Sequence, residues 1–183
     1  MKRFALCAIA AVLAAVSPAH ALENENLLVS LPTGYKVGYQ KSGAQQVISE
    51  MVPAGETVEN WSEMITVQIF LGMRNVTPTQ YRERMQGLWA NACAGSEFAG
   101  VKEGPENGYP TLTWMQKCPL NQGTGKAEMT WIKAVQGRDS FYLVQKAYTF
   151  EPSVEQSKAW GEFLDSVRVC DTRLPDRPCK LGG

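Results

Sequence analysis

The sequence predicts an α+β fold, an antiparallel sheet of about six strands with two amphipathic helices packed on it. Three observations favour this class. Segments with strand-like alternation occur in runs, only two segments have the apolar spacing of a helix, and each of those two follows a capping box. The resulting order is strands, helix, strand meander, helix. This order is typical of α+β domains, because parallel α/β folds alternate single strands with helices.

The first part of the chain predicts four strands. We expect them at residues 27–31, 35–40, 47–52 and 64–71. The last is the clearest, since its aliphatic residues from Ile65 to Leu71 alternate on one face. Met64 and Phe70 make the opposite face partly apolar as well. A strand that is apolar on both faces is covered on both sides, so we expect it at the centre of the sheet.

The first helix is predicted to begin at Thr77. Thr77 can cap the helix, Pro78 suits its first position and Gln80 completes a capping box. An apolar stripe at helical spacing follows: Tyr81, Met85, Leu88, Trp89 and Ala92. The helix is expected to end near Cys93 and to bury its stripe against the sheet.

The second half of the chain predicts more strands and a terminal helix. The strands are expected at residues 98–103, 110–118, 129–135 and 141–150, the last two joined by a Gly-Arg-Asp turn. Ser153 and Gln156 form a second capping box. The buried stripe of the helix that follows comprises Trp160, Phe163, Leu164 and Val167, and we expect this helix to stop at Cys170. If each helix buries three to five large apolar side chains, at about 1.5–3 kcal/mol each, the core is sufficient for one domain.

The first 21 residues have the pattern of a secretory signal peptide. A basic start precedes an apolar run from Phe4 to Val16, which is shorter than the roughly 20 residues of a membrane span. Ser17-Pro18 breaks this run, and the small-x-small triplet from Ala19 to Ala21 completes the pattern. We expect cleavage after Ala21, which leaves a single α+β domain over residues 22–183. The expected location is the periplasm, with release to the medium as the alternative.

Composition excludes several classes of function. The chain has 18 basic and 18 acidic residues, and removal of Lys2 and Arg3 with the leader leaves 16 against 18, a net charge of −2. Nucleic acid is therefore not an expected partner. His20 is the only histidine and lies in the leader, so Ser-His-Asp and Cys-His catalysis and imidazole zinc sites are excluded. We expect no cofactor, no metal and a monomeric protein that is not an enzyme.

Four cysteines remain after the leader, and in an exported protein they predict a disulfide framework. We favour the sequential pairing Cys93–Cys118 and Cys170–Cys179 among three connectivities. The first bond closes a loop worth roughly 3 kcal/mol, and the second would hold residues 171–178 on the end of the last helix. A redox pair or a thiolate zinc site is the rival interpretation, but both usually contain a Cys-x-x-Cys motif, which the chain lacks.

The element order and one short motif resemble a known fold group. Residues Leu31-Pro32-Thr33-Gly34-Tyr35, followed by strands, helix, meander and helix, resemble the PsbP/Mog1/DcrB-like fold. The exported DcrB-like proteins of bacteria are similar in size and setting, and the segment from Val52 to Trp61 is similar to one in uncharacterised exported proteobacterial proteins. The chain differs from DcrB-like proteins because it has two cysteine pairs and no lipobox. The resemblance implies a non-catalytic accessory or scaffold role and no catalytic residues.

One polar loop is the candidate interaction site. It consists of Glu56, Glu59, Asn60, Trp61 and Glu63. Its carboxylates have oxygens that Ca²⁺ could use, but their spacing matches no calcium loop, so a solvated acidic loop is the ordinary interpretation. Trp61 is either a contact residue or, as we prefer, a lid on the core.

The function favoured by these observations is a non-catalytic accessory or interaction protein. Its partner would be an unidentified envelope protein or a small apolar ligand. The alternative is a small-molecule or lipid carrier, because large apolar residues are frequent on the strands: Met64, Phe70, Trp114, Met129, Trp131, Phe141 and Phe150. A core filled solidly by these side chains would count against a carrier. A carboxylate-based hydrolase is a third hypothesis, although no pair of acids stands out.

Overall fold

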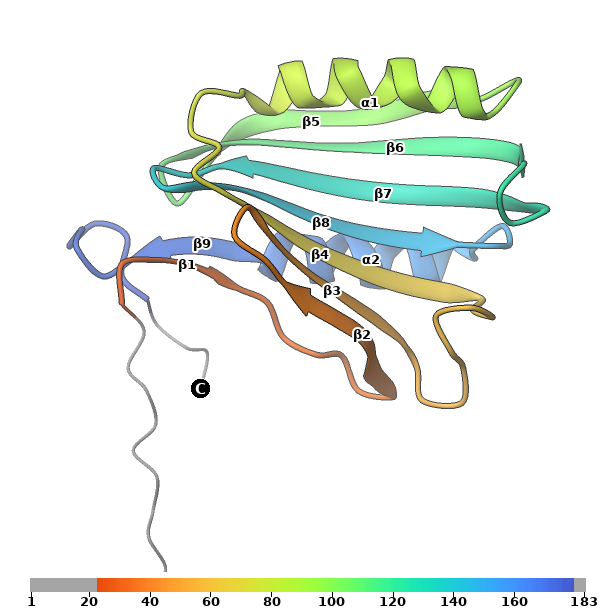
Figure 1. Ribbon diagram of the computed structural model, residues 1–183, viewed down its shortest axis with the longest axis horizontal. Helices are drawn as coiled ribbons and strands as arrows, with labels where there is room; N and C mark the ends of the chain where they lie inside the picture. Colours follow the sequence, from red (N-terminus) through yellow and green to blue (C-terminus); the bar gives the residue numbers. More distant parts are fainter. Residues whose placement is uncertain (1–22, 180–183) are drawn as a thin grey trace, which may run out of the picture.

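The computed structural model describes residues 23–179 (Figure 1). The predicted cleavage after Ala21 lies outside these residues. The described elements, in chain order, are β1 (Glu25–Leu28), β2 (Tyr35–Ser42), β3 (Gln46–Pro53), β4 (Glu63–Leu71), α1 (Pro78–Ala92), β5 (Glu97–Glu106), β6 (Tyr109–Asn121), β7 (Lys126–Gln136), β8 (Ser140–Tyr148), α2 (Val154–Ser166) and β9 (Arg168–Asp171). No helix among them is long and apolar enough to cross a membrane.

The main sheet has seven strands in the order β2-β3-β4-β8-β7-β6-β5, and every neighbouring pair is antiparallel. The predicted α+β class is confirmed, with seven strands in place of about six. As expected, β4 lies inside the sheet, between β3 and β8. The first predicted strand is not part of this sheet, because β1 pairs with β9 in a separate two-stranded ribbon.

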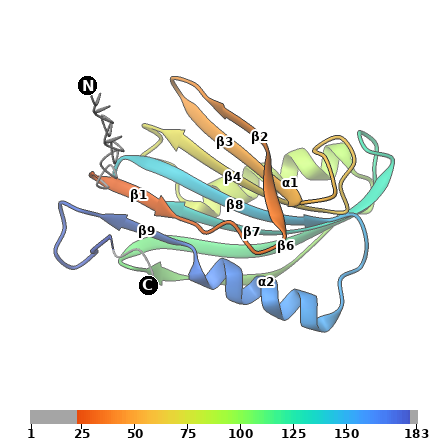
Figure 2. The same cartoon turned by 90° about the horizontal axis from the view of Figure 1, so that it is seen from below.

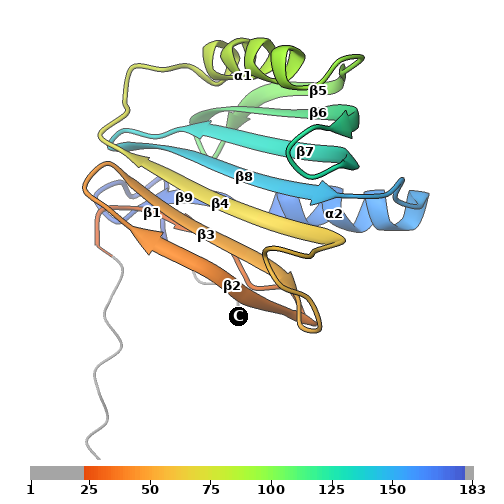
Figure 3. The same cartoon turned by 45° about the vertical axis from the view of Figure 1, so that its right-hand side comes forward.

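The two helices cover opposite faces of the sheet, and Figure 2 shows the sheet between them. Alternation along β8 explains both layers, because successive side chains of a strand point to opposite faces. Phe141 packs with Trp114 on the α1 side. Val144 packs with Leu164 of α2 on the other side. Figure 3 shows α1 above β5 and β6, at the side of the sheet away from β2.

Both helices begin where the capping boxes predict. The Thr77 hydroxyl accepts a hydrogen bond from the Gln80 N–H (3.1 Å), and the Gln80 side chain accepts one from the Thr77 N–H (2.9 Å). Ser153 and Gln156 repeat the arrangement at the start of α2. The caps satisfy backbone N–H groups that the first helical turn leaves without partners.

The expectation that α1 buries its apolar stripe is confirmed only in part, because Tyr81, Met85 and Trp89 are half-buried while Leu88 and Ala92 are exposed. Only Pro78 of α1 is fully buried, and Leu88 is 57% exposed. Tyr81 packs against the cluster that contains Trp114 and Phe141, whereas Leu88, two turns further along the helix, does not belong to that cluster. In α2, by contrast, Leu164 is buried, and Trp160 and Phe163 pack around it.

The C-terminal region also differs from the prediction. The helix α2 ends at Ser166 and not at Cys170, and the chain continues into β9, which pairs with β1. The disulfide Cys170–Cys179 is present, as is Cys93–Cys118, so the sequential pairing is the one found. The second bond therefore holds the tail on β9, where we expected the end of the helix.

Candidate functional site

A cleft of about 390 Å³ lies between α1 and the end of β4, and we call it the α1 cleft. One wall comes from Phe70 at the end of β4 and from the loop that leads to α1. The opposite wall is a single face of α1. Its lining residues are Phe70, Met73, Val76, Gln80, Tyr81, Arg84, Met85 and Leu88. Most of them are apolar, so the cleft is an apolar recess at the surface.

The sequence of α1 explains why this cleft is open. At the N-terminal end, the Tyr81 ring contacts Phe70 and Phe141, with centroids 5.8 and 4.9 Å away, so this end of the helix packs on the sheet. Further along the same face come Met85 and Leu88, which lie in the cleft wall. Side chains at these spacings share one helical face. Three residues of the predicted stripe, Tyr81, Met85 and Leu88, therefore line an open cleft.

The charge of the α1 cleft comes from a single residue. Arg84 is the only charged side chain in its lining, and it makes no ion pair within residues 23–179. Burial raises the pKa of the Tyr81 phenol, and the nearby Arg84 guanidinium partly opposes that rise. The cleft thus combines an apolar surface with one exposed cation.

A buried lysine forms a second unusual site, on the α2 face of the sheet. Lys146 of β8 is 0% exposed, and its Nζ atom lies 2.5 Å from Glu63 Oε2 and 2.7 Å from the Tyr35 hydroxyl. The same Nζ lies 3.9 Å from the centroid of the Trp160 ring and 4.7 Å from that of Tyr148. Such cation–π contacts are strong when the cation is desolvated.

Burial lowers the pKa of Lys146 to about 8, although the hydrogen bond and charge of Glu63 oppose this shift. Burial also raises the pKa of Tyr35, and the Glu63 carboxylate adds to that effect. A lysine with a lowered pKa can act as a nucleophile or base. Here the aromatic rings and Glu63 surround the ammonium group and leave it no exposed surface, so its contacts hold β2, β4, β8 and α2 together.

The residues of the predicted interaction loop lie in two different settings. Glu63 is bonded to Lys146, and Glu56 accepts hydrogen bonds from the Ser62 backbone (2.7 Å) and hydroxyl. Glu59 and Asn60 are exposed, and Trp61 is half-buried. The two inward carboxylates stabilise the loop. A contact role for Glu59, Asn60 and Trp61 stays a prediction.

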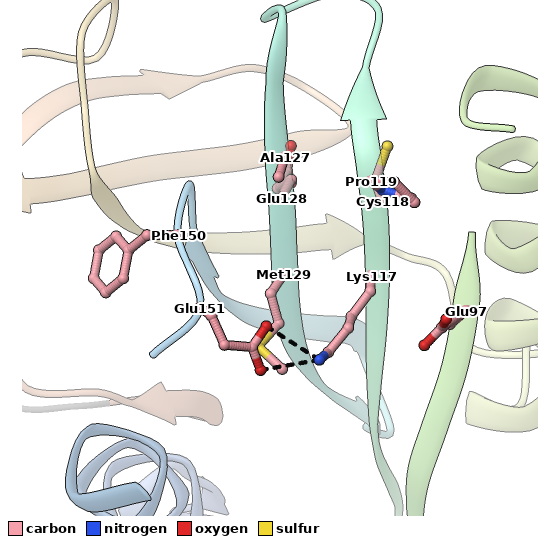
Figure 4. Close-up of a pocket in the computed structure, with 9 residues that line it drawn as sticks. All are labelled: Glu97, Lys117, Cys118, Pro119, Ala127, Glu128, Met129, Phe150 and Glu151. Atoms are coloured by element: carbon pink, nitrogen blue, oxygen red, sulfur yellow. Dashed lines mark hydrogen bonds and ion pairs between the residues drawn. The ribbon is translucent and has the colours of Figure 1, made fainter. Parts of the chain in front are cut away.

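A small pocket of about 150 Å³ is lined by Lys117 and three glutamates (Figure 4). The glutamates are Glu97, Glu128 and Glu151. Lys117 donates to both oxygens of Glu151, at 3.0 and 3.2 Å, as the dashed lines in Figure 4 show. Glu128 accepts from Asn121 and Thr130. Two of the acids therefore already have partners, and residues 23–179 contain no cluster of His, Cys, Asp or Glu placed to hold a metal ion.

Sequence reasoning missed both the α1 cleft and the Lys146 site. The cleft depends on how far α1 stands from the sheet, which a helical stripe does not encode. For Lys146 a signal exists, because it interrupts the apolar run from Phe141 to Tyr148 at a position that alternation places on a covered face. A lysine in such a position requires a buried partner.

Comparison with known proteins yields similarity of fold alone. No protein-family model and no curated protein matches the chain. The Ran-binding protein Mog1p of Saccharomyces cerevisiae matches with a TM-score of 0.46 and 10% identity, over 77% of this chain and 84% of that one. LpqN of Mycobacterium tuberculosis, described as involved in cell envelope biogenesis, matches with a TM-score of 0.48 and 10% identity, over 80% and 84%.

A third similar structure is cyanobacterial PsbP (CyanoP) from Synechocystis sp. PCC 6803. Its TM-score is 0.45 and its identity 11%, over 80% of this chain and 90% of that one. The resemblance to the PsbP/Mog1-like fold is confirmed at the level of the fold. The resemblance to exported proteobacterial proteins stays a prediction.

Proposed function

We propose that this chain is an exported, non-catalytic accessory protein that binds an apolar group in the α1 cleft. The observation that carries the proposal is the cleft itself. Its volume, about 390 Å³, falls within the roughly 300–1,000 Å³ of small-ligand pockets, and its lining is mostly apolar. Half-exposed apolar side chains on an otherwise polar helix are typical of a surface that a second molecule covers.

The packing of the core favours a surface cleft over an interior carrier cavity. Of the large side chains that motivated the carrier hypothesis, Trp114 and Phe141 are 0% exposed and Met64 is 8% exposed, so they fill the sheet interior. Phe70 alone of that set lines the α1 cleft. The ligand or partner group would therefore bind at the protein surface, beside α1.

Export and the absence of catalysis have separate support. The leader pattern of residues 1–21 and two disulfides are typical of proteins in an oxidising compartment. The chain beyond the leader has no histidine. The one lysine with a strongly lowered pKa is enclosed, and two acids of the small pocket are already hydrogen-bonded.

The binding site is tested with a neutral apolar dye, Nile red, and the oxidised full-length exported protein. Leu88 is 57% exposed, so Leu88→Glu introduces a charge into the cleft without disturbing the core. We expect this variant to bind the dye at least tenfold more weakly than the wild type. The matched control is Val154→Glu on α2, where the side chain is 80% exposed and away from the cleft. Equal dye affinity in all three proteins would refute the cleft as the binding site.

Export is tested independently by cell fractionation and N-terminal sequencing. We expect the protein in the periplasmic fraction to begin at Leu22 and to contain no free thiol. A protein that stays in the cytoplasm with its cysteines reduced would contradict the proposed location.

A further inference from the structure

We infer that the α1 cleft binds a single-chain amphiphile with an anionic head group, whose chain lies along α1 and whose head pairs with Arg84. This inference rests on the proposed function, because it names the ligand class of the same cleft. Three observations carry it: the elongated apolar wall, the single unpaired cation and the small size of the lining.

The apolar wall runs along the helix axis. Tyr81, Met85 and Leu88 lie four and then three residues apart, on one face of α1. From Tyr81 to Leu88 the helix rises about 10 Å. An elongated chain contacts such a wall along its length. Met73 and Met85 add flexible, polarisable side chains, which adapt to the shape of a bound chain.

The charge of the lining selects the head group. Arg84 is exposed, so its guanidinium can pair with an anion at the mouth of the cleft while the chain lies inside. A guanidinium binds carboxylate or phosphate through two parallel hydrogen bonds. Glu83 is the neighbouring acid on α1, but adjacent helical residues do not share a face, so it does not neutralise Arg84. A cationic head group would be repelled at this position.

The size of the lining favours a small ligand over a protein partner. Eight side chains line the α1 cleft. A stable protein interface takes roughly 20–30 residues from each side. A single chain with one charged end matches the apolar lining and its single cation.

The test uses displacement of Nile red from the oxidised full-length exported protein. Three competitors share a twelve-carbon chain and differ in head group: dodecanoate, dodecyltrimethylammonium and neutral dodecyl maltoside. All are used below their micelle-forming concentrations. We expect dodecanoate to displace the dye at a concentration at least tenfold lower than either of the others.

The variant Arg84→Gln separates the head group from the chain. Whatever its affinity for Nile red, we expect this variant to lose the preference for dodecanoate, so that its ratio of displacing concentrations between dodecanoate and dodecyl maltoside falls about tenfold towards one. Arg168→Gln is the control, because Arg168 is an exposed arginine of β9 outside the cleft lining, and its preference should be unchanged.

The outcomes distinguish this inference from the proposed function. If Leu88→Glu abolishes dye binding but the three competitors displace the dye equally, the cleft binds apolar groups and the inference about the head group is overturned. The same holds if Arg84→Gln keeps the dodecanoate preference. If the wild type binds no dye and no competitor, both proposals are overturned.

Discussion

Cys93, the C-cap residue of α1, is bonded to Cys118 of β6, with Cα atoms 5.8 Å apart. Both residues are 2% exposed. At its other end α1 buries Pro78 and packs the Tyr81 ring against Phe141, and one face of the helix lines the α1 cleft. The disulfide thus attaches the C-terminal end of the helix to the sheet.

Replacing Cys93 and Cys118 together by serine should destabilise the protein and loosen α1. The bond joins two cysteines 25 residues apart in the sequence, and its loss should lower the free energy of unfolding by about 3 kcal/mol. Chemical denaturation measures this change. Hydrogen exchange should show faster exchange in α1 than in the central strands, since a helix with few buried contacts opens locally.

The control for this prediction is the double variant Cys170→Ser/Cys179→Ser. It removes a disulfide that holds the tail on β9, far along the chain from α1. We expect it to change exchange in the tail and to leave α1 as in the wild type. Unchanged α1 exchange in the Cys93/Cys118 variant would show that packing, and not the disulfide, holds the helix.

Gly137 should not tolerate a side chain. It lies in the β7–β8 turn, where Glu25 accepts hydrogen bonds from the Asp139 and Ser140 N–H groups and from the Tyr142 hydroxyl. A Cβ atom at Gly137 would lie 2.1 Å from Glu25 Oε1 and 2.8 Å from the Ser140 carbonyl oxygen. Gly137→Ala should therefore displace the carboxylate and cost roughly 2 kcal/mol, within the range for overpacking.

Thermal unfolding measures the effect of Gly137→Ala. The control is Gly55→Ala, where a Cβ atom meets nothing within 4 Å. We expect a clear drop in Tm for the first variant and little change for the second. An equal Tm in both would mean that Glu25 moves aside at no cost and that its bonds to the turn contribute little to stability.

Lys133 should be important for the docking of α2. It is 1% exposed, and its Nζ atom donates to the carbonyl oxygens of Leu164 (2.7 Å) and Val167 (2.8 Å) and pairs with Glu106. A cation at this point satisfies carbonyls that the last turn of a helix leaves without partners. Lys133→Met should cost about 3 kcal/mol, because it leaves these carbonyls and Glu106 without their partner.

A double-mutant cycle separates the two roles of Lys133. If much of the cost is the carboxylate left without its partner, adding Glu106→Gln to Lys133→Met should restore part of the lost stability. Full additivity of the two substitutions, measured by denaturant unfolding, would argue that Lys133 acts through the α2 carbonyls alone.

Local sequence signals predicted much of the fold, and long-range packing explains what they missed. The capping boxes at Thr77 and Ser153 are complete within four residues, so the sequence alone locates both helix starts. The pairing of β1 with β9 joins opposite ends of the described chain, and no local pattern encodes it. The apolar spacing of α1 predicted which residues share a face, but spacing does not encode how deeply each is buried: Tyr81 packs on the core, whereas Leu88 is 57% exposed.

The Lys146 site predicts a specific pH dependence of stability. Burial lowers the pKa of Lys146 to about 8 in the folded protein, while a lysine in an unfolded chain titrates near about 10.4. Well below pH 8 both the folded and the unfolded protein carry the proton, so Lys146 does not make the free energy of unfolding depend on pH. Between about pH 8 and 10 the folded state has lost the proton that the unfolded state keeps. The free energy of unfolding therefore rises with pH in this window, by up to about 1.4 kcal/mol per pH unit.

Lys146→Met removes this titration and should reduce the rise between pH 8 and 10, which urea unfolding at half-unit pH intervals measures; burial also lowers the pKa of Lys133, so a smaller rise should remain. The raised pKa of Tyr35 acts in the opposite sense above about pH 10, since the unfolded tyrosine then loses a proton that the folded one keeps. The rise due to Lys146 is thus confined to the range between about pH 8 and 10.

The control is Lys158→Met, which replaces an exposed lysine of α2 and should keep the wild-type dependence of stability on pH. A wild-type curve that is flat or falls from pH 8 to 10 would mean that Glu63 and the aromatic rings keep Lys146 charged, and that the ion pair outweighs the cost of its burial.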